Sequence, residues 1–100
     1  MLSYSRGVKR IEWNEAKNIK LKIERGISFE EVQSALEEGY LLDNIAHPNK
    51  KDHPNQRILV VAINNYAFLV PFVEDEEKIV LKTIYPSSKF TKKYIIGGKK

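Results

Sequence analysis

Two stretches in the first forty residues place apolar side chains at helical spacing between residues that begin and end helices. In the first, "IEWNEAKNIKLKIERG", the residues Ala16, Ile19 and Ile23 recur at three- and four-residue intervals. Asn14 precedes them and is a good N-cap, because its side chain can accept a bond from a free helical N–H. Gly26 follows them and can adopt the left-handed conformation that ends a helix. The pattern predicts a helix between Asn14 and Gly26.

The second stretch, "ISFEEVQSALEEG", carries a sharper signal for a helix start. Ser28 and Glu31 have the spacing of a capping box, and Ile27 and Val32 occupy the two positions of a hydrophobic staple. These residues predict a second helix over Phe29–Glu38, ended by the glycine that follows it. We expect the buried stripe of this helix to consist of Phe29, Val32 and Leu36.

The second half of the chain has the alternating, β-branched and aromatic pattern of strands. The runs "RILVVAI", "YAFLVPFV" and "KIVLKTIY" predict an antiparallel meander, and "YLLDNIAHP" a further short strand before a polar loop. Asn64 and Asn65 join the first two runs, and asparagine tolerates the positive φ that a tight hairpin requires. Pro71 cannot donate to a ladder, so a local irregularity is expected there.

Together these elements predict an α+β fold in one domain spanning residues 1–100. Two N-terminal helices are expected to pack on one face of a three- to four-stranded antiparallel sheet, followed by a short C-terminal helix or tail. A chain of 100 residues fits a single core.

The composition excludes several classes of protein. With 42% hydrophobic and 30% charged residues, the chain has the balance of a soluble globular domain. Cysteine is absent, which excludes disulfides, thiolate metal sites and cysteine nucleophiles. No run of about 18 apolar residues occurs, and no apolar stretch follows the first basic residues, so we expect a cytoplasmic protein.

The distribution of charge along the chain is a better guide to the partner than the net charge of +4. From Lys78 to the end there are seven lysines and no acidic residue, whereas the acids gather earlier, most densely in the run "EDEE" that begins at Glu74. A basic segment of this kind favours a polyanionic partner, such as nucleic acid. The acidic run is best explained as a soluble turn.

The basic segment interleaves cations with aromatic residues and hydroxyls. If "SKFTKKY" is helical after the proline, with Ser87 or Ser88 as its N-cap, then Lys89 shares a face with Lys92 or Lys93. Aromatic residues among lysines suit single-stranded RNA, whose bases stack while its phosphates are neutralised. The flanking aromatic residues are Tyr85 and Tyr94, although a tyrosine at a strand end is commonly only the edge of a core.

Two further cations stand on predicted strands. Arg57 opens the first long strand, where it could hold a phosphate with two parallel bonds or simply pair with a carboxylate at a sheet edge. Lys82 lies among β-branched residues of the last strand, where a solvated position is the ordinary explanation.

The histidines suggest weaker alternatives. His47 and His53 border the loop "HPNKKDHPNQ", and Asp52 could add an oxygen ligand, but the spacing matches no known metal site. We therefore predict no metal and no cofactor. His53 remains a candidate general acid or base, because histidine titrates near neutral pH.

The order and spacing of several blocks resemble the BrnT-type toxins of prokaryotic type II toxin–antitoxin modules. The resemblance rests on "IEWNEAKN", "ERGISFEEV", "QRILVVAIN", "YAFLVPFV" and "LKTIYPSSKFTKKY", and covers nearly the whole chain. It implies a RelE-like ribonuclease fold and a toxin that cleaves RNA without a metal, inhibiting translation. It also implies a cognate antitoxin as partner, which usually carries a ribbon-helix-helix-type DNA-binding part and through which oligomers can form.

Carried over position by position, the resemblance places the family's strand arginine on Arg57 and its strand lysine on Lys82. The basic motif at the end falls on Lys89, Lys92 and Lys93. Where relatives commonly have an arginine this chain has Ser88, and where they have a small residue it has Phe90. Serine cannot clamp a phosphate with two bonds, so the alternative is a catalytically inactive RNA- or protein-binding module of the same fold.

Metal-free cleavage of RNA has three chemical demands. The 2′-hydroxyl must lose its proton, the dianionic phosphorane must be stabilised, and the leaving 5′-oxygen must be protonated. Cationic side chains can meet the second demand, and a lysine crowded by other cations can titrate low enough to serve the others. The catalytic candidates are Arg57, Lys82, Lys89, Tyr85 and His53, and the RNA-binding candidates are Ser87, Lys92, Lys93 and Tyr94.

Overall fold

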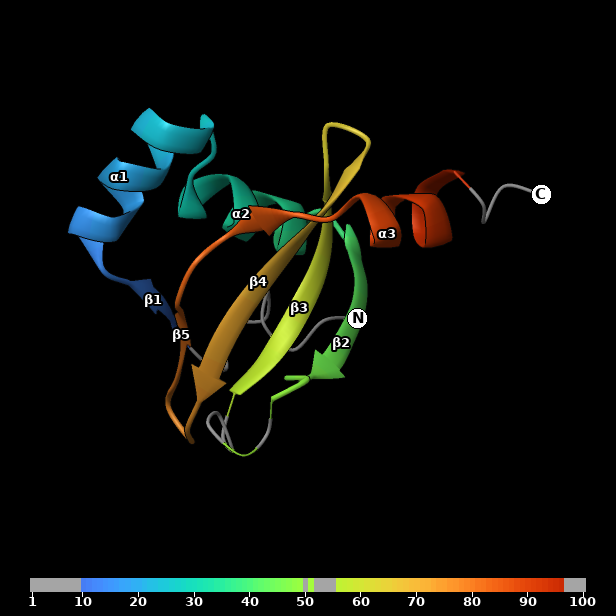
Figure 1. Cartoon of the computed structure of the whole chain (residues 1–100). Coiled ribbons are helices and arrows are strands. Elements are labelled where there is room, and N and C mark those ends of the chain that lie inside the picture. The colour runs from blue at the N-terminus through green and yellow to red at the C-terminus, as the bar shows by residue number, and fades with distance from the viewer. Residues whose placement is uncertain (1–9, 50, 52–55, 97–100) are drawn as a thin grey trace.

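The computed structural model describes residues 10–49, 51 and 56–96 of the chain (Figure 1). Along the chain the elements are β1 (Arg10–Trp13), α1 (Glu15–Arg25), α2 (Phe29–Glu37), β2 (Leu41–Ala46), β3 (Gln56–Ile63), β4 (Tyr66–Glu74), β5 (Lys78–Leu81), β6 (Tyr85–Pro86), α3 (Ser88–Thr91) and the π-helical turn η2 (Lys92–Ile96).

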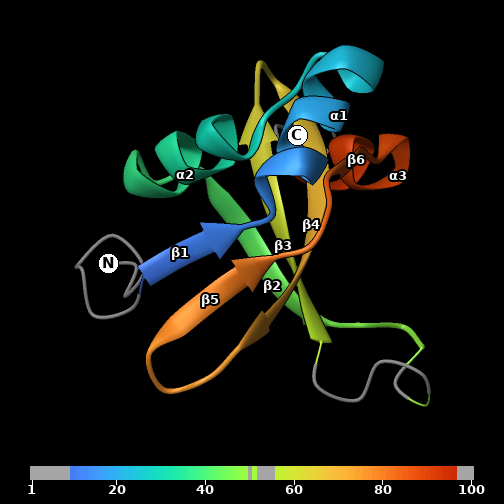
Figure 2. The ribbon, with the colours of Figure 1, turned by 90° about the vertical axis from the view of Figure 1, so that its left-hand side faces the viewer.

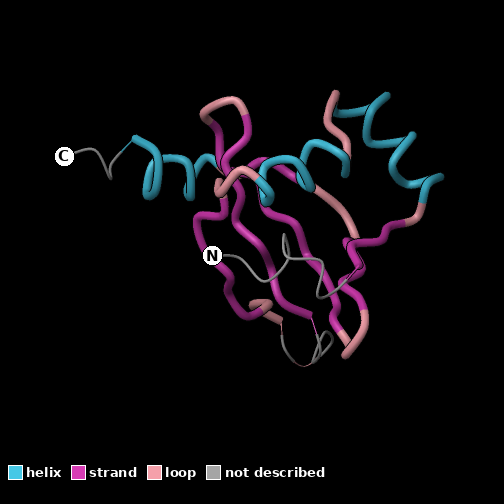
Figure 3. Tube along the Cα trace, turned by 180° about the vertical axis from the view of Figure 1, so that it is seen from behind, coloured by secondary structure: helices cyan, strands magenta, loops and turns pink. Residues whose placement is uncertain are grey.

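The described strands, magenta in Figure 3, form one six-stranded sheet in the order β1-β5-β4-β3-β2, with the short β6 paired to β4. All pairings are antiparallel except that of β1 with β5, which is parallel. The α+β class is therefore confirmed, but the expected three to four strands were too few. The strands β1 and β6 have only four and two residues, which is too short for alternation to reveal a strand.

The helix ends follow the predicted caps. Asn14 accepts a bond from the N–H of Lys17, and Gly26 ends α1 with a φ of 65°. In α2 the capping box of Ser28 and Glu31 is complete, with bonds in both directions. These motifs act within one turn, so the local sequence alone sets them.

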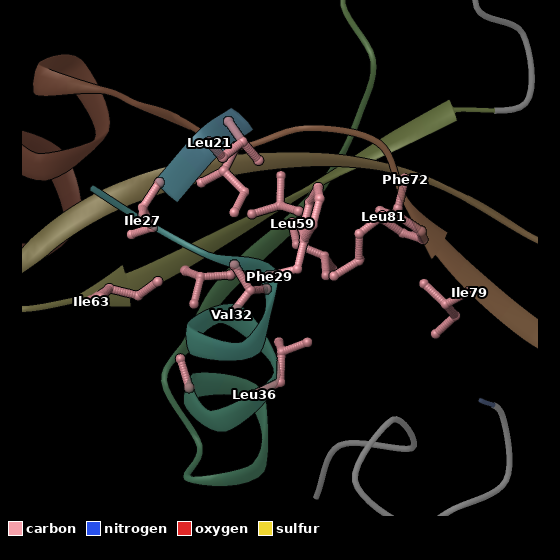
Figure 4. Close-up of a cluster of buried hydrophobic side chains, with 14 residues drawn as sticks. Leu21, Ile27, Phe29, Val32, Leu36, Leu59, Ile63, Phe72, Ile79 and Leu81 are labelled. Atoms are coloured by element: carbon pink, nitrogen blue, oxygen red, sulfur yellow. The ribbon is translucent and has the colours of Figure 1, made fainter. Parts of the chain in front are cut away.

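One face of the sheet is covered by α2, and the main core lies between them (Figure 4). We call this the helix-covered face. Phe29 at the start of α2 is fully buried and stacks on Trp13 of β1, with ring centroids 5.6 Å apart. The other members of this core are Leu21, Ile27, Val32, Ala35, Leu36, Leu59, Val61, Ile63, Val70, Phe72, Ile79, Leu81 and Ile84.

The helix α1 is turned so that Asn18 and Leu21 face inward. Asn18 is fully buried, accepts a bond of 2.8 Å from the Phe29 N–H, and donates one of 2.9 Å to Glu30 Oε1. Ile19 and Ile23, which the helical spacing singled out, are instead 50% and 79% exposed. The inward face of α1 is thus held by hydrogen bonds as well as by apolar contact.

Pro71 lies within the β4 ladder beside an irregularity, as expected. Its carbonyl accepts the N–H of Lys82. Leu81 pairs with Phe72 and Tyr85 pairs with Leu69, so the partner strand has one more residue between these two pairs than β4 has. In an antiparallel ladder a residue's N–H and C=O point to the same neighbour. An N–H at Pro71 would face the same partner strand, and because proline has none, the ladder lacks a donor at the place where that strand bulges.

A hydrogen bond from Arg25 connects the bulge to α1. The guanidinium Nη1 of this last residue of α1 donates a 2.5 Å bond to the carbonyl of Ile84, which is itself fully buried. A buried carbonyl without a hydrogen-bond partner destabilises the folded state. This bond therefore stabilises both the bulge and the position of α1 against the sheet.

Replacing Arg25 with methionine is expected to lower the free energy of unfolding by about 1–3 kcal/mol, because the Ile84 carbonyl loses its donor. Urea denaturation followed by circular dichroism measures this change. The exposed Lys20 on the same helix provides the control, and Lys20→Met should change stability by no more than about 0.5 kcal/mol. Equal effects of the two substitutions would show that the bond contributes nothing.

The second face of the sheet carries α3 and η2, on the side opposite α2 (Figure 2). The hydroxyl of Thr91 in α3 accepts the N–H of Ala67, which is paired with Ala62. This places the last helical segment across the ends of β3 and β4. None of the helices in the described part of the chain is long and apolar enough to cross a membrane.

Candidate nucleic-acid interface

The segment after Pro86 is helical, as the sequence predicts. Ser87 is the N-cap, and its hydroxyl accepts the N–H of Phe90 at 3.1 Å. Thr91 is buried and bonds both to the Ala67 N–H and to the Ser87 carbonyl. The segment is therefore anchored to β4 through buried hydrogen bonds, and the side chains on its outer side are held in place.

These outer side chains form a cluster of cations and aromatic rings, which we call the cation–aromatic cluster: Lys89, Phe90, Lys93 and Tyr94. The two rings stack with centroids 5.9 Å apart and planes 16° from parallel. Lys93 Nζ lies 5.2 Å from the Tyr94 centroid and 6.0 Å from that of Phe90, and Lys89 Nζ lies 5.9 Å from that of Phe90. The predicted grouping of Lys89 with Lys93 on one face is confirmed.

Tyr94 joins this cluster to strand β2. Its hydroxyl donates a 2.5 Å bond to Asp43 Oδ2, and Asp43 Oδ1 accepts the N–H of Asn44 at 2.7 Å. Asp43 is paired with Val60, so its side chain lies on the second face, under η2. The bond spans 51 residues of sequence and closes η2 over the sheet.

This contact shifts the pKa values of both partners. The bond from Tyr94 is the main cause that lowers the pKa of Asp43, with help from the Asn44 N–H and from the charges of Lys93 and Arg57, while burial acts in the opposite direction. The pKa of Tyr94 is raised, first by its bond to Asp43 and then by burial. The pair is therefore most stable with an ionised carboxylate and a neutral phenol.

This shift predicts a contribution to stability that depends on pH. The pKa of Asp43 in the folded state lies below its pKa in the unfolded state, so the stabilisation is present above the unfolded pKa and is lost as the pH falls through the folded pKa. We expect the stability of Tyr94→Phe to fall less steeply with acid than that of the parent protein. Urea denaturation at a series of pH values from neutral to strongly acidic measures the difference, and parallel curves would contradict it.

Arg57 lies in β3, next to the edge strand β2, and on the opposite face of the sheet from the cation–aromatic cluster. Its Nε donates to Asn44 Oδ1 at 2.8 Å and its Nη2 to the Asn44 carbonyl at 2.9 Å. Arg57 is exposed and is paired with Phe72, so it emerges on the helix-covered face. Its charge still reaches Asp43, whose pKa it helps to lower. Arg57 and the cation–aromatic cluster thus flank β2 from its two sides.

The two remaining strand candidates lie on the second face. Lys82 is exposed and follows the inward-facing Leu81, so alternation turns it away from the helices. Its side chain makes no hydrogen bond or ion pair with the residues that the structure describes. Tyr85 is half-buried in β6 opposite Leu69. The structure places both on the face that carries α3, but joins neither to Arg57.

The other predicted residues fall outside the cluster or outside the described residues. Lys92 is exposed on η2, beside the cluster, and its side chain makes no hydrogen bond, ion pair or ring contact with the described residues. His53 and Asp52 lie outside the described residues. In the described part of the chain no group of three or more histidine, aspartate or glutamate side chains could hold a metal ion.

Sequence reasoning missed Asp43 and Asn44, the two residues on which the site's long-range contacts converge. A carboxylate in the mostly apolar stretch "YLLDNIA" was a signal, because aspartate is rarely buried without a partner. Its partner could not be named from the sequence, since Tyr94 lies in a different element. Phe90 was noted only as a departure from the resembled family, whereas in the structure its ring contacts three other members of the cluster.

Chemically, the arrangement offers positive charge, stacking rings and a hydrogen-bonded tyrosine within one surface that crosses from α3 to β2. Such a surface suits the backbone and bases of a single strand. Comparison with protein-family models, with curated proteins and with solved structures gives no match for this chain.

Proposed function

We propose that this chain is the toxin component of a type II toxin–antitoxin module and acts as a metal-independent ribonuclease that inhibits translation. The observation that carries the proposal is the cation–aromatic cluster, held against β2 by the Tyr94–Asp43 bond, with Arg57 bonded to Asn44 of the same strand on the other face of the sheet. The strand, two helices and antiparallel meander are consistent with the fold that the resemblance implies.

In this proposal the cations bind the RNA backbone and stabilise the phosphorane. Lys82 and Lys89 supply positive charge on the second face and Arg57 supplies it beside β2 on the helix-covered face, and each donor that bound RNA brings close to its reacting phosphate is worth roughly a few kcal/mol of transition-state stabilisation. Proton transfer falls to Tyr85, His53 or Lys82. Lys92, Lys93, Tyr94 and Ser87 hold the strand on either side of the reacting bond.

A cognate antitoxin is the proposed protein partner, bound over the same basic surface. The seven lysines from Lys78 onward, with no acid among them, favour a partner segment that is acidic and masks them. A neighbouring gene that encodes a small DNA-binding protein would support this part of the proposal.

A second candidate is an RNA-binding module without catalytic activity. Two observations favour it. Arg57 already donates two hydrogen bonds to Asn44. Lys82 lies on the other face of the sheet from Arg57. Ser88, exposed at the start of α3, supplies no clamp in place of the family's arginine.

Cleavage of RNA in the presence of EDTA separates the two candidates. Incubating the pure chain with a labelled single-stranded RNA should give discrete products if the chain is a ribonuclease. RNA that stays intact but binds with an affinity that falls steeply with salt supports the module instead. Expression of the chain alone in bacteria should arrest growth only in the first case, and RNA that neither binds nor is cleaved would contradict both.

A further inference from the structure

The apolar residues of α1 form a stripe on the outside of the molecule. Ile23 is 79% exposed, Ile19 is 50% exposed, and Ala16 is exposed as well. We call these three residues the outer stripe of α1. The opposite side of the helix carries the buried Asn18 and Leu21. In Figure 1 α1 stands at the left-hand margin of the molecule, beyond the edge of the sheet.

The outward direction of the stripe is fixed by contacts on the inner side of α1. Asn18 bonds in two directions, to the Phe29 N–H and to Glu30, and Arg25 bonds to the carbonyl of Ile84. Turning the helix to bury its isoleucines would break these bonds and leave buried polar groups without partners, at a cost for each one. The helix therefore presents its apolar side to solvent as part of the folded state.

The stripe has the spacing of a helix-docking surface. Its residues stand at positions i, i+3 and i+7, which is the anchor pattern that one helix presents to another. Single exposed apolar residues are ordinary on a protein surface, but aligned ones opposite a buried face mark contact sites.

Charge indicates which kind of partner fits. The helix carries four basic residues against the acidic Glu15 and Glu24, a net charge of +2, and the whole chain carries +4. A second copy of the chain is disfavoured by its own charges. With Ile19 opposite Ile23 in a two-fold antiparallel pair, Lys20 of each copy would face Lys22 of the other.

We propose that the outer stripe of α1 docks an amphipathic helix of another protein, whose apolar residues are bordered by aspartate or glutamate. Ile19 and Ile23 pack against the apolar residues of that helix, and Lys20 pairs with an acidic residue beside them. This inference does not depend on RNA binding or cleavage, because the stripe lies on α1 and the cation–aromatic cluster on α3 and η2.

The test uses the full chain and two synthetic helical peptides of about 18 residues, each with leucines at i, i+3, i+4 and i+7. One peptide has glutamates beside the leucines, and its twin has lysines there. Fluorescence anisotropy measures the binding of each. We expect the acidic peptide to bind at least about 10-fold more tightly than the basic twin, with an affinity that weakens as salt increases.

Substitutions then locate the binding site. The double change Ile19→Ser with Ile23→Ser should weaken binding of the acidic peptide at least about 10-fold. The matched control is Ile96→Ser, which alters an isoleucine that is 61% exposed on η2 and should leave binding unchanged. Lys20→Glu should narrow the preference for the acidic peptide. Circular dichroism of each variant confirms that the fold is retained.

Three results would overturn the proposal. They are no binding of the acidic peptide at millimolar concentration, equal binding of the two peptides, and equal loss in Ile96→Ser and the double variant. A further contrary result is a dimer, seen by light scattering, that the double variant abolishes, because it would assign the stripe to a second copy of this chain.

Discussion

Replacing Arg57 with alanine is expected to lower the rate of RNA cleavage in EDTA by about 10²- to 10³-fold, the usual effect of removing one donor from a developing oxyanion. Arg57 donates its Nε–H and one Nη2–H to Asn44, so three of its five N–H donors remain for a phosphate. Because Asn44 holds the guanidinium in place, little conformational freedom remains to be lost when the phosphate binds.

Single-turnover cleavage of a labelled RNA at saturating protein measures this effect apart from binding. Arg57→Lys should fall between the parent and Arg57→Ala, because lysine keeps the charge but cannot donate two parallel bonds. Lys20→Ala, on the exposed side of α1, removes one positive charge away from the cluster and should retain nearly full activity. Full activity of Arg57→Ala would remove Arg57 from the catalytic site, and a thermal melt excludes unfolding as the cause of a loss.

The sequence predicted those parts of the fold that depend on neighbours along the chain. The caps of α1 and α2 and the hairpin at Asn64 and Asn65, whose φ values are 54° and 63°, are set by a few consecutive residues. The grouping of Lys89 with Lys93 is of the same kind, because positions four apart on a helix always meet. Local chemistry decides each of these features.

The remaining features depend on contacts between distant parts of the chain. The rotation of α1 is set by bonds that span 11, 12 and 59 residues, from Phe29 to Asn18, from Asn18 to Glu30 and from Arg25 to Ile84. Helical spacing gave the correct apolar stripe but could not tell whether it lies inside or outside. The parallel pairing of β1 with β5 likewise joins residues nearly seventy positions apart.

The candidate site divides in the same way. Its lysines and Tyr94 lie in one short segment, from Lys89 to Tyr94, and could be predicted from the sequence, whereas the role of Phe90 was missed. The other half is Asp43 with Asn44, which becomes part of the site only because η2 crosses the second face and Tyr94 reaches β2. A lone strand carboxylate has many conceivable partners, and only the folded chain selects one of them.

Replacing Phe29 with alanine is expected to lower the free energy of unfolding by about 3–5 kcal/mol, the range for removing a buried phenylalanine. Phe29 is fully buried, stacks on Trp13 of β1, and lies where α1, α2 and the sheet meet. Its N–H is also the donor that holds Asn18, so a shift of this residue would loosen α1 as well. For a small domain whose total stability is about 5–15 kcal/mol, this loss brings the protein near unfolding.

Urea denaturation followed by circular dichroism measures the loss without relying on Trp13, whose surroundings the substitution changes. The control is Ile23→Ala, because Ile23 is apolar but 79% exposed, and its removal should change stability by no more than about 0.5 kcal/mol. The contrast between the two separates the core of the protein from the outer stripe of α1. If Ile23→Ala destabilised the fold as much as Phe29→Ala, α1 would be packed with its isoleucines inward, and the outward stripe would be wrong.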